Sequence, residues 1–183
     1  MEVNSNKFNI NKRKDLFKKM LEAEDFCYEY NSIRPSKLSE RNKMLREFLG
    51  EVNGNFLIFS PFKCGVGENI KLGNNVFIGG NCTILDFASV TFGDDVWVGA
   101  NSGFYTSGHD TDSINRINGE GYANPIQIGN NVWIGASATI VCSSKSGIEI
   151  GENSIIATGS VINKNVPSNV LVAGNPFRVI RQL

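Results

Sequence analysis

The feature that most constrains this chain is a large apolar residue at every sixth position from residue 66 to residue 162. An α-helix repeats its apolar face every 3.6 residues and an isolated strand every two, so a period of six fits neither. The period is typical of a solenoid of very short strands, three of which close one triangular turn. The repeating positions are Val66, Leu72, Ile78, Ile84, Phe92, Val98, Phe104, Ile128, Ile134, Ile140, Ile150, Ile156 and Ile162. The sequence therefore predicts an all-β fold, a parallel β-helix of hexapeptide repeats.

The repeat is interrupted in three places. Two residues are inserted near Val90, about four in 142–147, and a long polar excursion occupies 108–125. The excursion carries His109, the only histidine of the 183 residues. A loop of this length on a solenoid is usually either functional or disordered, and its composition does not decide between the two. It is nevertheless the first place to look for chemistry.

The N-terminal quarter of the chain has a different pattern. Residues 12–25 and the stretch that follows Pro35 carry apolar side chains at helical spacing. Two helices of this length are too short for a domain, so we expect them to cover the first turn of the solenoid. The expected division is a helical cap region, 1–55, and a β-helix domain with a C-terminal tail, 56–183.

Composition excludes several function classes. Lys plus Arg equals Asp plus Glu at 18 each, without the clustered basic face of a nucleic-acid-binding protein. No apolar run approaches the roughly 18 residues that span a bilayer, and residues 1–15 lack the apolar core of a signal peptide. We therefore expect a cytoplasmic protein with neither a nucleic-acid nor a membrane partner.

The four cysteines are widely spaced and form no C-x-x-C pair. This pattern favours reduced structural thiols over a zinc site or a disulfide, and we expect no metal. The cysteines are Cys27, Cys64, Cys82 and Cys142.

Three segments carry a specific family resemblance. They are 106–109 (TSGH), 125–135 (PIQIGNNVWIG) and 172–181 (VAGNPFRVIR), with 81–86 (NCTILD) as a fourth, weaker element. Over roughly 26–183 the chain resembles the hexapeptide-repeat acyltransferases, specifically their maltose and galactoside O-acetyltransferase branch. The resemblance implies left-handed coiling and a homotrimer with active sites in the clefts between neighbouring prisms. It also implies acetyl-CoA as co-substrate and a sugar or glycan hydroxyl as acceptor.

A catalytic role for His109 is the central implication of this resemblance. Attack of a hydroxyl on a thioester needs a base, and an imidazole suits that task near neutral pH. A lone loop histidine can equally be idle, but the surrounding motif favours general-base catalysis. Because no Ser or Cys stands beside His109 in a nucleophile motif, we expect direct transfer without an acetyl-enzyme intermediate.

The resemblance also marks a set of acetyl-CoA residues. Ala136 and Thr158 match positions whose backbone meets the pantetheine arm, and the basic side chains suit the phosphates. Trp133 either packs near the arm or fills a trimer contact, and each of the last four residues could equally be a solvated surface group. The set is Trp133, Ala136, Thr158, Asn163, Lys164, Arg178 and Arg181.

The acceptor side of the site matches the family less well. Asn81 and Asp86 are the expected acceptor-binding residues, although an Asp at a solenoid corner is equally a turn former. At three positions this chain has a non-polar residue where the sugar-acetylating relatives carry a polar one, and at position 121 it has a glycine in place of a bulkier residue. The replacing residues are Gly65, Gly79, Phe87 and Gly121.

The sequence therefore does not name the acceptor, and two alternatives stay open. One is acetylation of a non-sugar hydroxyl or an amino-sugar nucleotide, and the other is a catalytically decayed trimeric scaffold. A carbonic anhydrase on the same prism is excluded, because it needs three histidine ligands.

The outer faces of the predicted prism carry several aromatic side chains. Aromatic groups in such number on a small protein form the kind of patch that marks an interface. We therefore expect the homotrimer to bury them. The residues are Phe77, Phe87, Trp97 and Trp133.

Overall fold

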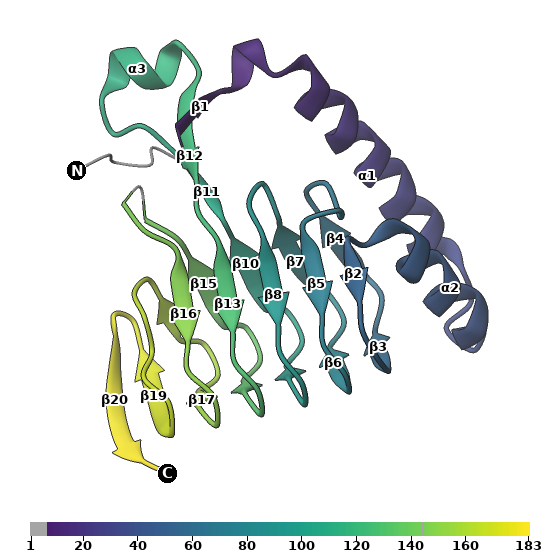
Figure 1. The fold of residues 1–183 in the computed structure, drawn as a ribbon, viewed down its shortest axis with the longest axis vertical. Coiled ribbons are helices and arrows are strands. Elements are labelled where there is room, and N and C mark those ends of the chain that lie inside the picture. The colour runs from purple at the N-terminus through teal and green to yellow at the C-terminus, as the bar shows by residue number, and fades with distance from the viewer. Residues whose placement is uncertain (1–6, 144) are drawn as a thin grey trace.

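The repeats coil into a solenoid whose three faces are parallel β-sheets (Figure 1). This computed structural model describes residues 7–143 and 145–183. Successive strands of a face belong to successive turns. Lys71 pairs with Glu51 of the turn before it and with Thr91 of the turn after it, so one turn here contains 20 residues. Residues 1–6 and 144, which belong to the expected cap region and to the 142–147 insertion, lie outside the described residues.

Each face takes its name here from its first strand. The β2 sheet contains β2 (Glu51–Val52), β5 (Ile70–Leu72), β8 (Val90–Phe92), β13 (Ile126–Ile128) and β16 (Ile148–Ile150). The β3 sheet contains β3 (Phe56–Ile58), β6 (Val76–Ile78), β9 (Trp97–Val98), β14 (Trp133–Ile134), β17 (Ile155–Ile156), β19 (Val170–Gly174) and β20 (Phe177–Gln182). The β4 sheet contains β4 (Phe62–Cys64), β7 (Cys82–Leu85), β10 (Gly103–Tyr105), β15 (Thr139–Val141) and β18 (Val161–Ile162). All these neighbours are parallel except β19 and β20, which form an antiparallel end to the β3 sheet.

The core of the solenoid follows from strand alternation. In β5 the first and third residues, Ile70 and Leu72, are buried, and Lys71 between them is exposed. Large apolar residues fill the narrow interior, where the rings of Phe92 and Phe104 meet edge to face with centroids 5.2 Å apart. The period of six therefore predicted the inward-facing side chains, because each hexapeptide contributes one strand and one corner.

Two details of the predicted repeat are corrected. Val66, counted there as the first strand position, lies in the corner between β4 and β5, where its N–H donates to Asp86 Oδ1 at 2.9 Å. The solenoid begins earlier, because Glu51 of β2 already pairs with Lys71. The reason is that this corner, like the one after β7, is two residues longer than a regular hexapeptide corner, so counting backwards by sixes from Leu72 falls on the corner and misses the first three strands.

Two helices cover the first turn, as predicted. They are α1 (Lys14–Ser32), which is longer than the expected 12–25 and follows the short 3-10 helix η1 (Ile10–Lys12), and α2 (Leu38–Phe48). The hydroxyl of Tyr30 donates to the carbonyl of Ile58 at 2.6 Å, and Lys19 forms an ion pair with Glu68. The cap therefore closes the end of the apolar core with both packing and polar contacts.

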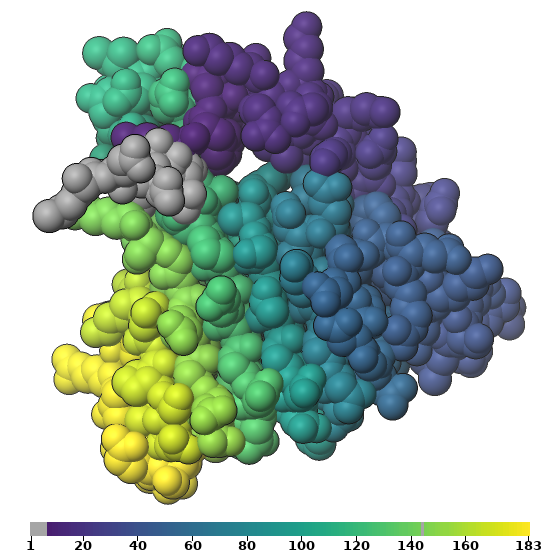
Figure 2. All heavy atoms as spheres, in the orientation of Figure 1, coloured from purple at the N-terminus to yellow at the C-terminus, as the bar shows by residue number. Residues whose placement is uncertain are grey.

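The excursion of residues 108–125 is an ordered element. It contains β11 (Ser107–His109), the short helix α3 (Ser113–Ile117) and β12 (Glu120–Ala123). Asp112 caps α3 by accepting from the N–H groups of Ile114 and Asn115, both at 2.9 Å. The N-terminal strand β1 (Lys7–Asn9) adds to β12, and the order β1-β12-β11 makes an antiparallel sheet, here called the loop sheet. Figure 2 shows the purple N-terminal segment lying against the green excursion.

Candidate active site

His109 is the last residue of β11, and its side chain is exposed. It is paired across the loop sheet with Gly121 of β12. The next strand, β1, pairs Phe8 with the same Gly121. The predicted candidate base therefore stands on a folded strand rather than on an irregular loop. The strand β1 was not predicted from the sequence, where its only signal is a short alternation of polar and apolar residues.

The base of the loop sheet is fixed to the solenoid through Thr106. This side chain is fully buried, and its hydroxyl donates to the carbonyl of Leu85 at 2.7 Å and accepts from Ala88 N–H at 3.1 Å. Its carbonyl accepts from the N–H of Asn124 at 2.8 Å, where the excursion returns. Both ends of the excursion are thus held at the corner between the β4 and β2 sheets.

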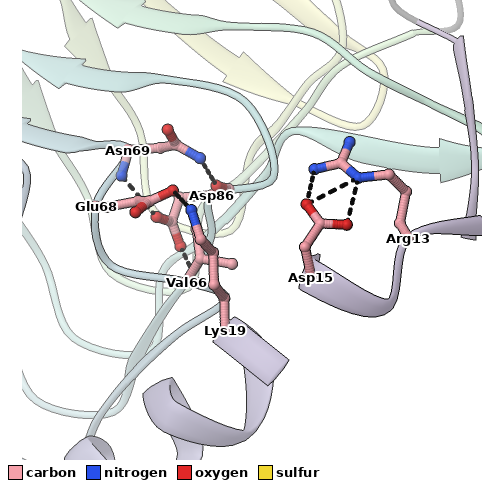
Figure 3. Close-up of polar contacts among 7 residues, drawn as sticks. All are labelled: Arg13, Asp15, Lys19, Val66, Glu68, Asn69 and Asp86. Atoms are coloured by element: carbon pink, nitrogen blue, oxygen red, sulfur yellow. Dashed lines mark hydrogen bonds and ion pairs between the residues drawn. The ribbon is translucent and has the colours of Figure 1, made fainter. Parts of the chain in front are cut away.

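Asp86 lies at the same corner, one turn earlier, and its side chain is fully buried (Figure 3). Oδ1 accepts from the N–H groups of Gly65 and Val66 at 2.8 and 2.9 Å, and Oδ2 accepts from Asn69 N–H at 3.3 Å. Burial raises the pKa of this carboxyl, and the backbone N–H donors oppose the shift. A carboxylate placed in this way organises the corner, which does not fit the acceptor-binding role expected for Asp86.

Asn81, the other expected acceptor residue, is exposed at the corner between the β3 and β4 sheets. Its backbone is left-handed, with φ of 61°. Its side-chain amide donates to Asn101 Oδ1 at 2.7 Å, in the equivalent corner of the next turn. This is a stacking contact between turns, and it places Asn81 at a different corner from His109.

The expected pantetheine residues lie on the β3 sheet and on the corner after it. The Trp133 side chain points outward, 56% exposed, and is paired with Trp97 of the previous turn. Ala136 and Thr158 occupy successive turns of the following corner. There a Cβ on Gly135 would lie only 2.6 Å from the backbone nitrogen of Thr158. Side chains are small along this ridge, so a ligand could approach the backbone closely.

The C-terminal end of the solenoid is positively charged. After Glu152 the chain carries no acidic side chain and three basic ones. Lys164 and its neighbour Asn163 are exposed after β18, and Arg178 and Arg181 are exposed on β20. None of these three cations forms an ion pair within the described part of the chain, although Lys164 Nζ lies 5.2 Å from the centroid of the Phe177 ring. Cations and a ridge of small residues fit a ligand that has a long, thin arm and phosphate groups, as acetyl-CoA has.

These groups do not form one pocket within a single chain. The strand β11, which ends in His109, leaves the solenoid at the corner between the β4 and β2 sheets, whereas Trp133 belongs to β14 of the β3 sheet, the face opposite that corner. The apolar core separates them. Among the described residues no cluster of three or more His, Cys, Asp or Glu side chains could hold a metal ion, and no helix is long and apolar enough to cross a membrane.

Comparison with known proteins places this architecture in a family. A family model for the maltose acetyltransferase hexapeptide capping motif matches residues 7–54, and one for the hexapeptide repeat of succinyl-transferase matches 69–103 and 125–164. The galactoside O-acetyltransferase of Escherichia coli is 39% identical over 165 residues, which cover 90% of this chain and 79% of that protein. The chain belongs to the galactoside and maltose O-acetyltransferase family.

Solved structures of this family agree with the fold described here. A galactoside acetyltransferase in complex with coenzyme A matches with a TM-score of 0.89 at 36% identity, covering 100% of this chain and 91% of that one. A hexapeptide-repeat acetyltransferase from Vibrio cholerae complexed with acetyl-CoA matches with a TM-score of 0.85 at 33% identity, covering 94% and 91%. The likeness confirms the left-handed parallel β-helix predicted from sequence.

Proposed function

We propose that this acetyl-CoA-dependent O-acetyltransferase transfers the acetyl group to a hydroxyl of a sugar or glycan, with His109 as the general base. The observation that carries the proposal is the placement of the only histidine. This histidine is exposed at the end of a strand that Thr106 anchors to the solenoid. The chain that carries it belongs to the galactoside and maltose O-acetyltransferase family. An idle surface histidine would not need a folded sheet to hold it.

The chemistry follows from what an imidazole and a thioester can do. Bound acetyl-CoA supplies an activated acetyl carbonyl. The neutral His109 ring accepts the proton of the acceptor hydroxyl as its oxygen attacks that carbonyl, and the resulting imidazolium returns a proton to the departing thiolate. Because the described thiols of Cys27, Cys64, Cys82 and Cys142 are all buried, no cysteine is available as a nucleophile. This supports direct transfer.

The complete site requires more than one copy of the chain. The loop sheet with His109 and the β3 sheet with Trp133 lie on opposite sides of one solenoid. A single chain therefore cannot place both residues in contact with one ligand. In a trimer the loop sheet of one subunit can approach the ridge of small residues and the cationic C-terminal end of its neighbour. Acetyl-CoA would then bind along the cleft, where Trp133, Ala136, Thr158, Asn163, Lys164, Arg178 and Arg181 contribute its contacts.

One observation favours a second candidate, acetyl transfer to a non-sugar hydroxyl. Phe87 is half-buried at the corner where the N–H of Ala88 donates to the Thr106 hydroxyl. The galactoside enzymes carry a polar residue at this position. A phenyl ring cannot accept or donate the hydrogen bonds that hold sugar hydroxyls. An apolar alcohol is therefore the alternative acceptor.

The test is acetyl transfer from radiolabelled acetyl-CoA to maltose, to p-nitrophenyl β-galactopyranoside and to p-nitrobenzyl alcohol. His109→Ala should lower turnover by about 10²–10⁴, the usual contribution of general-base catalysis, while coenzyme A binding measured by calorimetry persists. Turnover of the wild type should also fall on acidification, because a protonated imidazole cannot accept a proton. A loss of less than threefold in His109→Ala would reject the residue as the base.

A further inference from the structure

Two glycines of the loop sheet face aromatic rings on opposite sides. Directly paired residues of an antiparallel sheet point to the same face, so Phe8, Gly121 and His109 share one face. Lys7, Tyr122 and Gly108 form the next row and share the other face. A Cβ on Gly108 would lie 2.3 Å from the Tyr122 hydroxyl, so that ring covers the face away from His109.

The Phe8 ring covers the face that carries His109. Its Cζ and Cε1 atoms lie 3.3 and 3.7 Å from the position that a Cβ on Gly121 would occupy. The ring therefore lies over the middle strand, one strand spacing of about 4.8 Å from the strand that ends in His109. The same Cβ would lie 2.9 Å from the carbonyl oxygen of Gly108, so a glycine at position 121 lets both the neighbouring strand and the ring approach closely.

The strand that supplies Phe8 is firmly held. The Asn9 side-chain amide donates to the carbonyl of Asn118 at 2.9 Å and to Glu120 Oε1 at 2.8 Å. Ile10 N–H donates to the carbonyl of Gly119 at 2.9 Å. The Phe8 ring is half-buried and the His109 side chain is exposed, so both remain accessible on the same face of the loop sheet.

We propose that Phe8 determines acceptor specificity. Its ring is the apolar wall of the acceptor site beside His109, and it stacks against the apolar C–H face of a pyranose or against an aromatic aglycone. This proposal rests on the proposed function, because it assigns the acceptor to the side of His109. It gives the N-terminal strand a role in recognition, and it accounts for Gly121 as the residue that makes room for the ring.

The first arm of the test needs no activity. Because the protein has one histidine, a sample labelled at the histidine Cε1 gives a single imidazole signal per subunit. Phe8→Ala should move this signal by removing the ring current of the neighbouring phenyl group. Phe17→Ala, which removes an exposed aromatic side chain from α1, is the matched control and should leave the signal in place. An unchanged signal in Phe8→Ala would overturn the proposal.

The second arm measures steady-state kinetics on the three acceptors named above. Phe8→Ala should raise the acceptor KM roughly tenfold and leave the KM for acetyl-CoA within twofold, as expected when a substrate-binding surface is lost. Phe8→Tyr keeps the ring and should stay near the wild type, and Phe8→Leu should fall between the two. Trimer mass and melting temperature are checked for each variant.

The outcomes separate this proposal from the proposed function. If wild type acetylates a sugar and the acceptor KM of Phe8→Ala equals that of Phe17→Ala, the role of Phe8 is rejected and the function stands. A uniform loss of kcat with unchanged acceptor KM would also reject it, because the ring would then only hold His109. Transfer to p-nitrobenzyl alcohol but to neither sugar would reject the sugar acceptor, and the same KM ratio on the alcohol would then decide the role of Phe8.

Discussion

Asp86 and Asn69 hold each other by two hydrogen bonds at a corner of the solenoid. The Asn69 side-chain amide donates to the Asp86 carbonyl at 2.8 Å, and the Asn69 N–H donates to Asp86 Oδ2 at 3.3 Å. With Val66 N–H bound to Oδ1, the carboxylate satisfies backbone donors that the long corner leaves without strand partners. The corner beneath the candidate base is thus organised around one buried acid.

Asp86→Ala should destabilise the protein strongly. It would leave the buried N–H of Val66 and the partly buried N–H of Asn69 without their acceptor, at a cost of about 1–3 kcal/mol for the buried group and less for the partly buried one. We expect the free energy of unfolding in urea to fall by on the order of 3 kcal/mol. Asp94→Ala, which removes an exposed corner carboxylate that accepts from Asn74 N–H at 2.7 Å, should cost about 1 kcal/mol or less. An equal loss of unfolding free energy in the two variants would show that the Asp86 contacts stabilise the protein no more than those of Asp94.

The raised pKa of Asp86 also predicts a pH dependence. Since the folded state holds this proton to a higher pH than the unfolded chain, it binds more protons between the ordinary Asp pKa and the raised one. The contribution of Asp86 to stability should therefore decline as pH rises through that window. The difference in unfolding free energy between wild type and Asp86→Asn, measured from pH 3 to pH 7, should follow this decline, and a rise would contradict it.

The four thiols should resist modification in the folded protein. All are buried, and burial raises the pKa of Cys82 and brings that of Cys142 to about 11. The thiol of Cys27, 3.7 Å away, and burial also raise the pKa of Cys64, and the same contact lowers the pKa of Cys27. Little reactive thiolate of Cys64, Cys82 and Cys142 is then present at pH 8, and burial keeps Cys27 away from the reagent. A chromogenic disulfide reagent should react quickly with Ser36→Cys, an exposed control on the cap, and slowly with wild type until guanidinium unfolds it.

Arg181 should contribute to acetyl-CoA binding. It is an exposed cation on β20 without an acidic partner among the described residues, so a phosphate is a suitable counterion. Arg181→Ala should raise the KM for acetyl-CoA about tenfold with kcat nearly unchanged. Lys43→Ala, an exposed cation on α2, is the control. A KM that changes equally little in both variants would assign Arg181 to the solvated surface.

The aromatic face of the β3 sheet should mediate trimer formation. Trp97 and Trp133 are each 56% exposed, Phe59 is 41% exposed, and the rings of Phe77 and Trp97 have centroids 6.5 Å apart. A cluster of exposed aromatic side chains on one face is typical of a protein interface. Light scattering should give three times the 20.1 kDa chain mass for wild type and for Tyr28→Asp on the exposed side of α1, and a smaller mass for Trp97→Asp. A wild-type monomer at micromolar concentration would reject the trimer.

Much of this protein could be read from local pattern. The period of six predicted the parallel β-helix because a hexapeptide is one strand and one corner, so each repeat carries its own geometry. The helical cap followed from ordinary amphipathic spacing, and the motif around His109 identified the candidate base. Each of these conclusions depends on residues that are close in sequence, where spacing and propensity are informative.

The tertiary structure decided the rest, because it joins residues that are far apart in the chain. Asp86 changed from an expected acceptor contact to a buried corner residue only when Gly65 and Asn69 were seen to donate to it from the previous turn. Phe8 reaches the side of His109 only because β1 crosses more than a hundred residues of sequence to pair with β12. The spacing of residues along the sequence does not indicate such long-range pairings. Sequence determined the repeat and the catalytic candidate, and three-dimensional packing determined which side chains surround it.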